Sequence, residues 1–245
     1  MATAFSENLT AEQQAQVLQL FQQFQHPSLQ KDLIALNTLK KVEKGGDVLR
    51  IELQLPFAWN TGVEQVKQQL SDALLKATDS KEIKWVVNYQ IATLKRANNQ
   101  PAVKGVKNII AVTSGKGGVG KSSVSVNLAL ALQAQGARVG ILDADIYGPS
   151  IPHMLGAPHQ RPTSPDNQHI TPIKAYGLSA NSIGFLMDED NATIWRGPMA
   201  SSALSQLLNE TLWDSLDYLV IDMPPGTGDI QLTLSQQIPV TGAVV

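Results

Sequence analysis

The chain has 245 residues, of which 43% are hydrophobic, which is enough for one large domain core or two ordinary ones. Its formal net charge of -2 gives no overall attraction to nucleic acid or to an anionic membrane, so neither is expected as a partner. The absence of cysteine excludes disulfides and thiolate metal ligands within these residues. Its apolar runs are far shorter than the roughly 20 residues of a membrane-spanning helix. No secretory signal pattern opens the sequence, so a cytoplasmic location is expected.

The first hundred residues have the pattern of a small α+β unit. Thr10 and Gln13 have capping-box spacing, and the apolar residues that follow recur at helical intervals as far as His26-Pro27. Further periodic segments predict helices at 31–39 and 63–77 and strands at 47–55 and 83–91. A polar stretch without periodicity comes next. These patterns predict a small α+β domain at 1–95, a linker at 96–106 and a larger domain at 107–245.

The larger domain begins with the order strand, loop, helix, strand. Residues 108–113 form a continuous apolar run, 122–135 have the pattern of a helix that Gly136 ends, and 139–142 form a second buried strand. This order predicts a βαβ unit with parallel strands. Later segments predict strands at 178–186, 218–222 and 242–245 and helices at 199–208 and 230–237.

The loop after the first of these strands has the phosphate-binding pattern G-x-x-x-x-G-K-[ST], in the form Gly115-Lys116-Gly117-Gly118-Val119-Gly120-Lys121-Ser122. Glycines let successive backbone N–H groups turn towards phosphates, and the helix N-terminus adds partial positive charge. Lys121 is expected to reach the β and γ oxygens, and Ser122 to offer its hydroxyl to Mg²⁺. The sequence therefore predicts a nucleoside triphosphate bound by residues 115–122 and the adjoining Ser123. The predicted fold class is α/β, a P-loop NTPase with a mostly parallel sheet, preceded by a small α+β domain.

Three carboxylates follow the predicted strands. Asp143 and Asp145 come directly after one strand, and Asp222 ends another. Ligands of open α/β sheets bind at the carboxyl ends of the strands, so these side chains are expected to share one pocket. Asp222 is expected to join Ser122 near Mg²⁺. Of Asp143 and Asp145, one could hold a water of the Mg²⁺ shell and the other could orient the attacking water. A helix cap or a turn is the alternative role for Asp143 and Asp145.

Lys116 adds a second lysine to the phosphate loop. The loop is similar to the deviant P-loop of the MinD, ParA and nitrogenase-iron-protein ATPases, in the form Gly-Lys-Gly-Gly-Val-Gly-Lys-Ser. In that family the early lysine contacts phosphate bound by the partner subunit. The resemblance thus implies ATP as the nucleotide and a homodimer in which Lys116 acts in trans, whereas a solvated loop charge is the alternative. It also implies that Asp145 positions the attacking water and that Asp143 belongs to the Mg²⁺ site. The implied catalytic set is Lys116, Lys121 and Asp145, and 223–229 is an implied switch loop.

A narrower resemblance rests on three further segments: Asp143-Ala144-Asp145-Ile146-Tyr147-Gly148-Pro149-Ser150, Trp195-Arg196-Gly197-Pro198 and residues 222–229. They resemble the Mrp/ApbC branch of iron-sulfur cluster carriers, and the first hundred residues resemble a MIP18-type domain in pattern and order. The resemblance implies an ATP-hydrolysing carrier that binds iron-sulfur clusters and transfers them to apoproteins. Its implied partners are apo iron-sulfur proteins and a cluster-assembly scaffold.

The sequence departs from that branch in its cluster ligands. Carriers of this type hold the cluster through a Cys-x-x-Cys pair, and these 245 residues contain no cysteine. Ligation by this chain is therefore not expected. Because the sequence stops within a predicted strand, a partial sequence is the expectation, with a cysteine-free variant as the alternative.

Other functions fit parts of the pattern. A MinD/ParA-type positioning or partitioning ATPase is the main alternative, although no basic amphipathic helix or dense Lys/Arg run supports it. A nonenzymatic interaction module and a small-molecule kinase are further alternatives. Arg196 fits a nucleotide or dimer contact as well as a solvated position. The histidines in the proline-rich segment have irregular spacing that favours a surface loop over a metal site: His153, His159 and His169.

Overall fold

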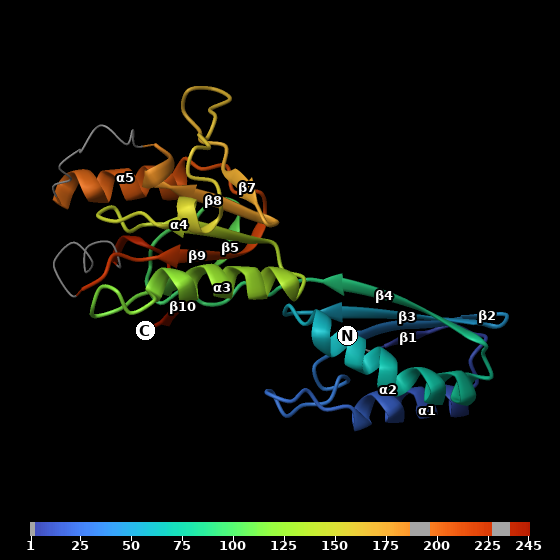
Figure 1. Cartoon of the computed structure of the whole chain (residues 1–245). Helices are drawn as coiled ribbons and strands as arrows, with labels where there is room; N and C mark the ends of the chain where they lie inside the picture. The colour runs from blue at the N-terminus through green and yellow to red at the C-terminus, as the bar shows by residue number, and fades with distance from the viewer. Residues whose placement is uncertain (1–2, 187–196, 227–235) are drawn as a thin grey trace. The chain divides into compact units, whose positions relative to one another are not determined.

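The computed structural model describes residues 3–186, 197–226 and 236–245 (Figure 1). The chain forms two compact units, Met1–Ala92 and Thr93–Val245. Within the described ranges, no helix combines the length and the apolar character that crossing a bilayer requires.

The first unit is a four-stranded sheet with two helices on one face (Figure 1). Helix α1 (Ala11–Gln23) joins the parallel strands β1 (Ala4–Phe5) and β2 (Leu39–Gly45). Helix α2 (Asn60–Thr78) joins the parallel strands β3 (Val48–Leu55) and β4 (Glu82–Tyr89). Strands β2 and β3 pair antiparallel, which gives the order β1-β2-β3-β4.

Local sequence signals account for most of this unit. The Thr10 hydroxyl accepts the Gln13 N–H at 3.2 Å, and the Gln13 side chain accepts the Thr10 N–H at 3.1 Å, which confirms the predicted capping box. Val17 and Phe21, four residues apart on α1, are fully buried. Alternate residues of β3 face the same core, as a period of two requires.

The helix predicted at 31–39 is wrong. Residues 33–37 form turns, and β2 already begins at Leu39. The Asp32 carboxylate accepts the N–H groups of Ile34 and Ala35, at 2.9 and 2.7 Å, and Asn37 has φ +53°. Asn37, whose backbone is left-handed, ends this helical turn. The apolar residues at helical spacing therefore lie in a turn that leads into β2.

The second unit is a six-stranded, mostly parallel sheet in the order β10-β5-β9-β6-β8-β7. Five strands run parallel, and β7 (Ile173–Ala175) pairs antiparallel with β8. The parallel strands are β5 (Val106–Val112), β6 (Val139–Asp143), β8 (Leu178–Ser182), β9 (Leu216–Asp222) and β10 (Gly242–Val244). This sheet after a small α+β unit confirms the predicted fold class.

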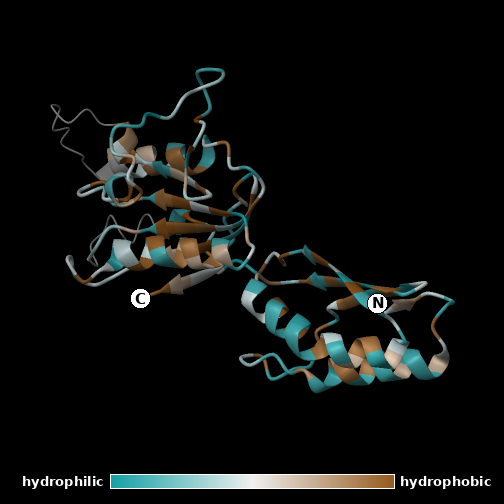
Figure 2. Cartoon of the chain, turned by 45° about the vertical axis from the view of Figure 1, so that its right-hand side comes forward, coloured by the Kyte–Doolittle hydropathy of each residue, from teal (hydrophilic) through white to brown (hydrophobic). Residues whose placement is uncertain are grey.

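Helices cover both faces of the larger sheet. Helix α3 (Lys121–Ala134) lies on one face and α5 (Gly197–Asn209) on the other, and the views of Figures 1 and 2 agree on this. The strands between them are largely hydrophobic (Figure 2), as expected for a parallel sheet buried on both sides. Two short elements, α4 (Ile151–Met154) and the 3₁₀ helix η1 (Ile183–Phe185), follow β6 and β8.

The segment predicted as a linker, 96–106, is packed within the second unit. The Ala97 N–H donates to the Val240 carbonyl at 2.7 Å, and the Asn98 side chain donates to the Ile238 carbonyl at 2.8 Å. Val103 is buried. Two polar side chains of this segment, Asn98 and Gln100, thus donate to a distant backbone segment. The predicted helix at 230–237 lies mostly outside the described residues.

Replacing Phe21 by alanine is expected to lower the free energy of unfolding of the first unit by about 3–5 kcal/mol, because it leaves a cavity in the core. Phe21 is fully buried and packs edge-on against Trp85, with ring centroids 6.3 Å apart. Urea unfolding followed by circular dichroism measures the change. Gln22→Ala, an exposed change on the same helix, should stay within about 0.5 kcal/mol of the unmodified chain, and an equal loss in both variants would contradict the assignment.

Candidate phosphate-binding site

The strands of the larger sheet end in register at one edge. Val112 of β5 pairs with Asp222 of β9, Asp222 pairs with Asp143 of β6, and Asp143 pairs with Ser182 of β8. The loops after these four strands therefore leave the sheet side by side. This register brings Asp143 and Asp222 side by side at the edge where ligands of open α/β sheets bind.

The phosphate loop connects the end of β5 with the first turn of α3. Residues 115–120 are exposed, and a Cβ atom added at Gly115, Gly117, Gly118 or Gly120 would meet nothing within 4 Å. Gly118 and Gly120 have φ values of +73° and +94°, which disfavour any residue with a Cβ. No side chain caps α3, so its first N–H groups are available to an anion. The loop is an open cradle of backbone donors.

Lys121, the first residue of α3, lies in a cluster of buried charge. Its Nζ is 2.7 Å from Asp222 Oδ1 and 3.6 Å from Asp145 Oδ2, and only 6% of its side chain is exposed. Ser122 Oγ donates to Asp222 Oδ2 at 2.6 Å, and Ser125 Oγ donates to Asp222 Oδ1 at 2.7 Å. One buried carboxylate thus joins β9 to the first turn of the helix.

Asp145 brings an unsatisfied oxygen to this cluster. Its Oδ1 is the single buried side-chain oxygen or nitrogen without a hydrogen-bond partner in the part of the chain that the structure describes. Burial raises the pKa of Asp145, although the charge of Lys121 opposes the rise. A buried oxygen without a partner costs free energy, so this atom is ready to accept from a water or to approach a cation.

Asp143 has its carboxylate directed at the backbone of its own loop. Oδ1 accepts the Asp145 N–H at 3.1 Å, and Oδ2 accepts both the Ile151 N–H and the Ser182 hydroxyl at 3.1 Å. Burial raises the pKa of Asp143 to about 7, and these hydrogen bonds oppose the rise. The side chain therefore fastens both ends of the loop 144–150 and fixes the backbone at Asp145.

Two further parts of the predicted site are Lys116, within the phosphate loop, and the loop that follows β9. Lys116 is exposed, and its side chain makes no hydrogen bond or ion pair with any described residue. The loop after β9 reaches the phosphate loop, because the Gly226 N–H donates to the Ser114 carbonyl at 2.9 Å. The rest of the predicted switch, 227–229, and Arg196 lie outside the described residues.

Oxygen donors predominate around Lys121, as a magnesium site requires. Within the described ranges, no three His, Cys, Asp or Glu side chains are grouped closely enough to hold a metal ion by themselves. Mg²⁺ at phosphate sites typically takes only one or two carboxylates and completes its shell with phosphate and water. The adjoining oxygens of Ser122 and Asp222 fit this arrangement. His169, one of the three histidines of the proline-rich segment, pairs with Asp166.

Comparisons with known proteins agree with this geometry. A family model described as ParA, the NUBPL iron-transfer P-loop NTPase, matches residues 105–245. This chain belongs to the NUBPL iron-transfer P-loop NTPase family. The predicted resemblance to iron-sulfur carriers of the Mrp/ApbC type is thereby confirmed.

Curated relatives in this P-loop NTPase family carry the name iron-sulfur cluster carrier protein. One from Haemophilus influenzae is 90% identical over 245 residues, which is 100% of this chain and 66% of the relative. One from Escherichia coli is 64% identical over 222 residues, or 91% of this chain and 60% of the relative. This chain thus spans 60–66% of the length of these two relatives.

A solved structure is also similar to this chain. It is described as the nucleotide-binding protein in complex with ADP from Archaeoglobus fulgidus. It is 40% identical to this chain, with a TM-score of 0.50, and the match covers 57% of this chain and 53% of that one.

Sequence reasoning missed two serines of this P-loop NTPase site. Ser125 is fully buried against Asp222, and Ser182 is fully buried against Asp143. Ser125 follows Ser122 by one helical turn, so the helical period could have indicated it. Ser182 carried no such signal, because only the pairing of β8 with β6 brings it to Asp143.

The loop that Asp143 fastens should loosen in Asp143→Asn. An amide can accept one N–H through its oxygen but presents its own N–H groups to the other donors, so at least one bond is lost. Amide hydrogen exchange at Asp145 and Ile151 is expected to become about tenfold faster. Ser182→Ala, which keeps both backbone bonds, should have a smaller effect. Unchanged exchange in Asp143→Asn would show that this carboxylate does not hold the loop.

Proposed function

We propose that this chain binds ATP with Mg²⁺ and hydrolyses it, and that it serves as the nucleotide-driven part of an iron-sulfur cluster carrier. The observation that carries the proposal is the meeting of an open phosphate loop with Lys121, Ser122 and Asp222 at one sheet edge. The family match to an iron-transfer P-loop NTPase supports the same activity.

Phosphate binding begins with an exchange of partners at Lys121. Its Nζ now contacts the carboxylates of Asp222 and Asp145, and the β and γ phosphate oxygens take their place when ATP binds. The N–H groups of residues 115–122 and the adjoining Ser123 cradle the phosphates. Ser122 and Asp222 would hold Mg²⁺, which would supply positive charge against the phosphates.

Hydrolysis requires a water placed in line with the γ-phosphorus. Asp145 Oδ1, buried and without a hydrogen-bond partner, accepts a hydrogen bond from that water and orients it. Asp143, which was expected near Mg²⁺, acts through the backbone, because its three hydrogen bonds keep Asp145 in place. The water oxygen bonds to the γ-phosphorus as the bond from that phosphorus to the bridging oxygen of ADP breaks, and the proton of the water passes to the released phosphate.

Lys116 acts between subunits of a homodimer. Its side chain is exposed beside the phosphate loop, and the described residues of its own chain give it no partner. Contact with the phosphates of the facing subunit would add positive charge where negative charge develops during hydrolysis.

The nucleotide state then controls transfer of the cluster, which is the cargo. A γ-phosphate holds the loop after Asp222 near the phosphate loop, and hydrolysis releases it. Because these 245 residues contain no cysteine, the cluster ligands come from outside them. The partners are a cluster-assembly scaffold and apo iron-sulfur proteins in the cytoplasm. The MIP18-like domain at 1–95 adds a surface on which such clients dock.

Lys121→Ala is expected to weaken nucleotide binding about tenfold to a hundredfold, since it removes charge-assisted bonds to phosphate. Titration with a fluorescent ATP analogue measures the loss, and circular dichroism verifies that the variant is folded. Cells whose chromosomal copy carries the substitution should also lose activity of iron-sulfur enzymes. Binding like that of the unmodified chain would refute the role of Lys121, whereas normal iron-sulfur enzymes with impaired binding would refute the carrier function.

Lys116→Ala should leave nucleotide binding by the monomer within about twofold and lower dimer-dependent hydrolysis at least about tenfold. Steady-state ATP hydrolysis, measured against protein concentration, separates the two effects, because only the dimer-dependent part rises with concentration. Lys31→Ala, an exposed change in the first unit, is the matched control. Turnover that rises with concentration as in the unmodified chain would rule out action in trans.

A further inference from the structure

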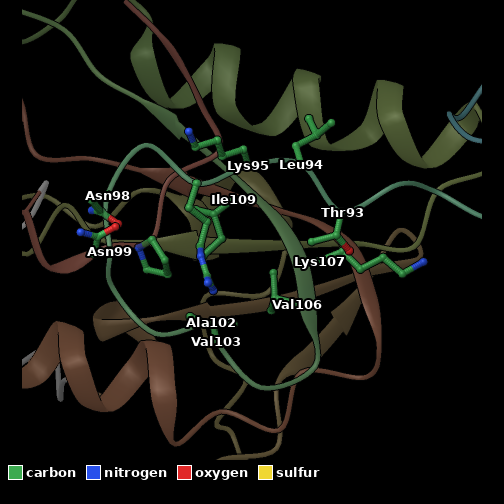
Figure 3. Close-up of a pocket in the computed structure, with 12 residues that line it drawn as sticks. Thr93, Leu94, Lys95, Asn98, Asn99, Ala102, Val103, Val106, Lys107 and Ile109 are labelled. Atoms are coloured by element: carbon green, nitrogen blue, oxygen red, sulfur yellow. The ribbon is translucent and has the colours of Figure 1, made fainter.

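The second unit has a cavity of about 640 Å³ beside the beginning of β5. In Figure 3, Thr93, Leu94 and Lys95 follow one rim, Asn98 and Asn99 lie at one end, and Ala102 and Val103 lie on the opposite side. All its lining residues belong to the second unit. Its volume is within the range of small-molecule sites, about 300–1,000 Å³.

This cavity is separate from the phosphate loop. It adjoins Val106 and Lys107, the first residues of β5, whereas the phosphate loop follows Val112 at the other end of the strand. A strand of this length spans about 20 Å at about 3.3 Å per residue. The cavity therefore has no part in the proposed phosphate chemistry.

The walls of the cavity are fixed before any ligand arrives. The Leu94 N–H donates to Asn108 Oδ1 at 2.8 Å, which ties one rim to β5. Hydrogen bonds from Ala97 and Asn98 attach the next turn of the chain to residues 238–240. Because hydrogen bonds already order these walls, ligand binding causes little further loss of conformational entropy.

The lining combines positive charge with an apolar floor. Lys95 and Arg96 are exposed and have no hydrogen bond or ion pair within the described part of the chain, and no acidic residue lines the cavity. Lys107 is already paired with Asp217 at 2.8 Å. The accessible part of this floor includes Ala102, which is exposed, and Val106, which is half-buried, whereas Val103 and Ile109 are only 5% and 3% exposed and offer little area. The cavity is thus locally cationic although the chain has a net charge of -2.

We propose that this cavity is a second binding site, which takes a small organic anion with an apolar body. Lys95 and Arg96 pair with the anionic group, and the apolar body covers Ala102 and Val106. An inorganic anion would leave these two apolar side chains in water, and a neutral apolar molecule would leave Lys95 and Arg96 unpaired. The complementary ligand therefore carries both features.

The test uses two fluorescent probes that differ in one group. Anilinonaphthalene sulfonate has an apolar ring system and an anionic group, and N-phenylnaphthylamine has the same rings without the sulfonate. Both are titrated in saturating magnesium ADP, so that the phosphate loop is filled. The double variant Lys95→Ala, Arg96→Ala should bind the sulfonate about tenfold more weakly and the neutral probe within about twofold.

Lys104→Ala is the matched control, because Lys104 is exposed near the cavity and does not line it. This variant should bind both probes like the unmodified chain. Benzoate is expected to displace the sulfonate at concentrations at least about tenfold lower than inorganic phosphate. Unchanged sulfonate binding in the double variant, or an equal loss in Lys104→Ala, would overturn the site. Equal displacement by phosphate and benzoate would overturn the ligand class.

Discussion

The contact between Asp222 and the first turn of α3 organises the larger unit. This carboxylate is fully buried, and a buried charge must be paired and hydrogen-bonded to be tolerated. Its partners, Lys121, Ser122 and Ser125, all belong to one helix turn. The helix N-terminus is therefore fixed at the end of β9. The residues between β5 and α3 have only to bridge a short gap, and glycine allows them to do so as an open loop.

The same contact sets the charge balance that a nucleotide meets. Lys121 lies between Asp222 and Asp145, and Asp143 is the register neighbour of Asp222 on β6. Two carboxylates therefore contact one lysine, and a third carboxylate lies on the strand next to one of them. When phosphate oxygens draw Lys121 away, the carboxylates lose their cation. Because a divalent cation replaces the positive charge that these carboxylates lose, the nucleotide is expected to bind together with such a cation.

The two edges of the larger sheet differ in charge. Carboxylates gather where the parallel strands end, beside the phosphate loop. At the other edge Asp217 is shared by Lys107 and Arg138, and Lys95 and Arg96 of the cavity have no carboxylate partner among the residues that the structure describes. One parallel sheet thus separates an acidic edge, suited to a metal and a phosphate, from a basic edge suited to an organic anion.

The sequence by itself determined the features that depend on neighbours along the chain. The glycine spacing and Lys121 fix the phosphate loop, the Thr10 capping box fixes the start of α1, and apolar runs fix the parallel strands, because each is a local property. Lys116 similarly distinguished this loop from an ordinary phosphate loop.

Only the tertiary structure decided the features that join distant segments. Residues 96–106 have the composition of a linker, but hydrogen bonds to residues 238–240 place them in the second unit. Asp143 had the position of a metal ligand, and its contacts with Ile151 and Ser182 arise from the fold of a loop and the order of strands. The cavity joins residue 93 to residue 239. The physical reason is common to all three: spacing along a chain encodes local geometry, and these contacts form only when the packed sheet brings remote residues together.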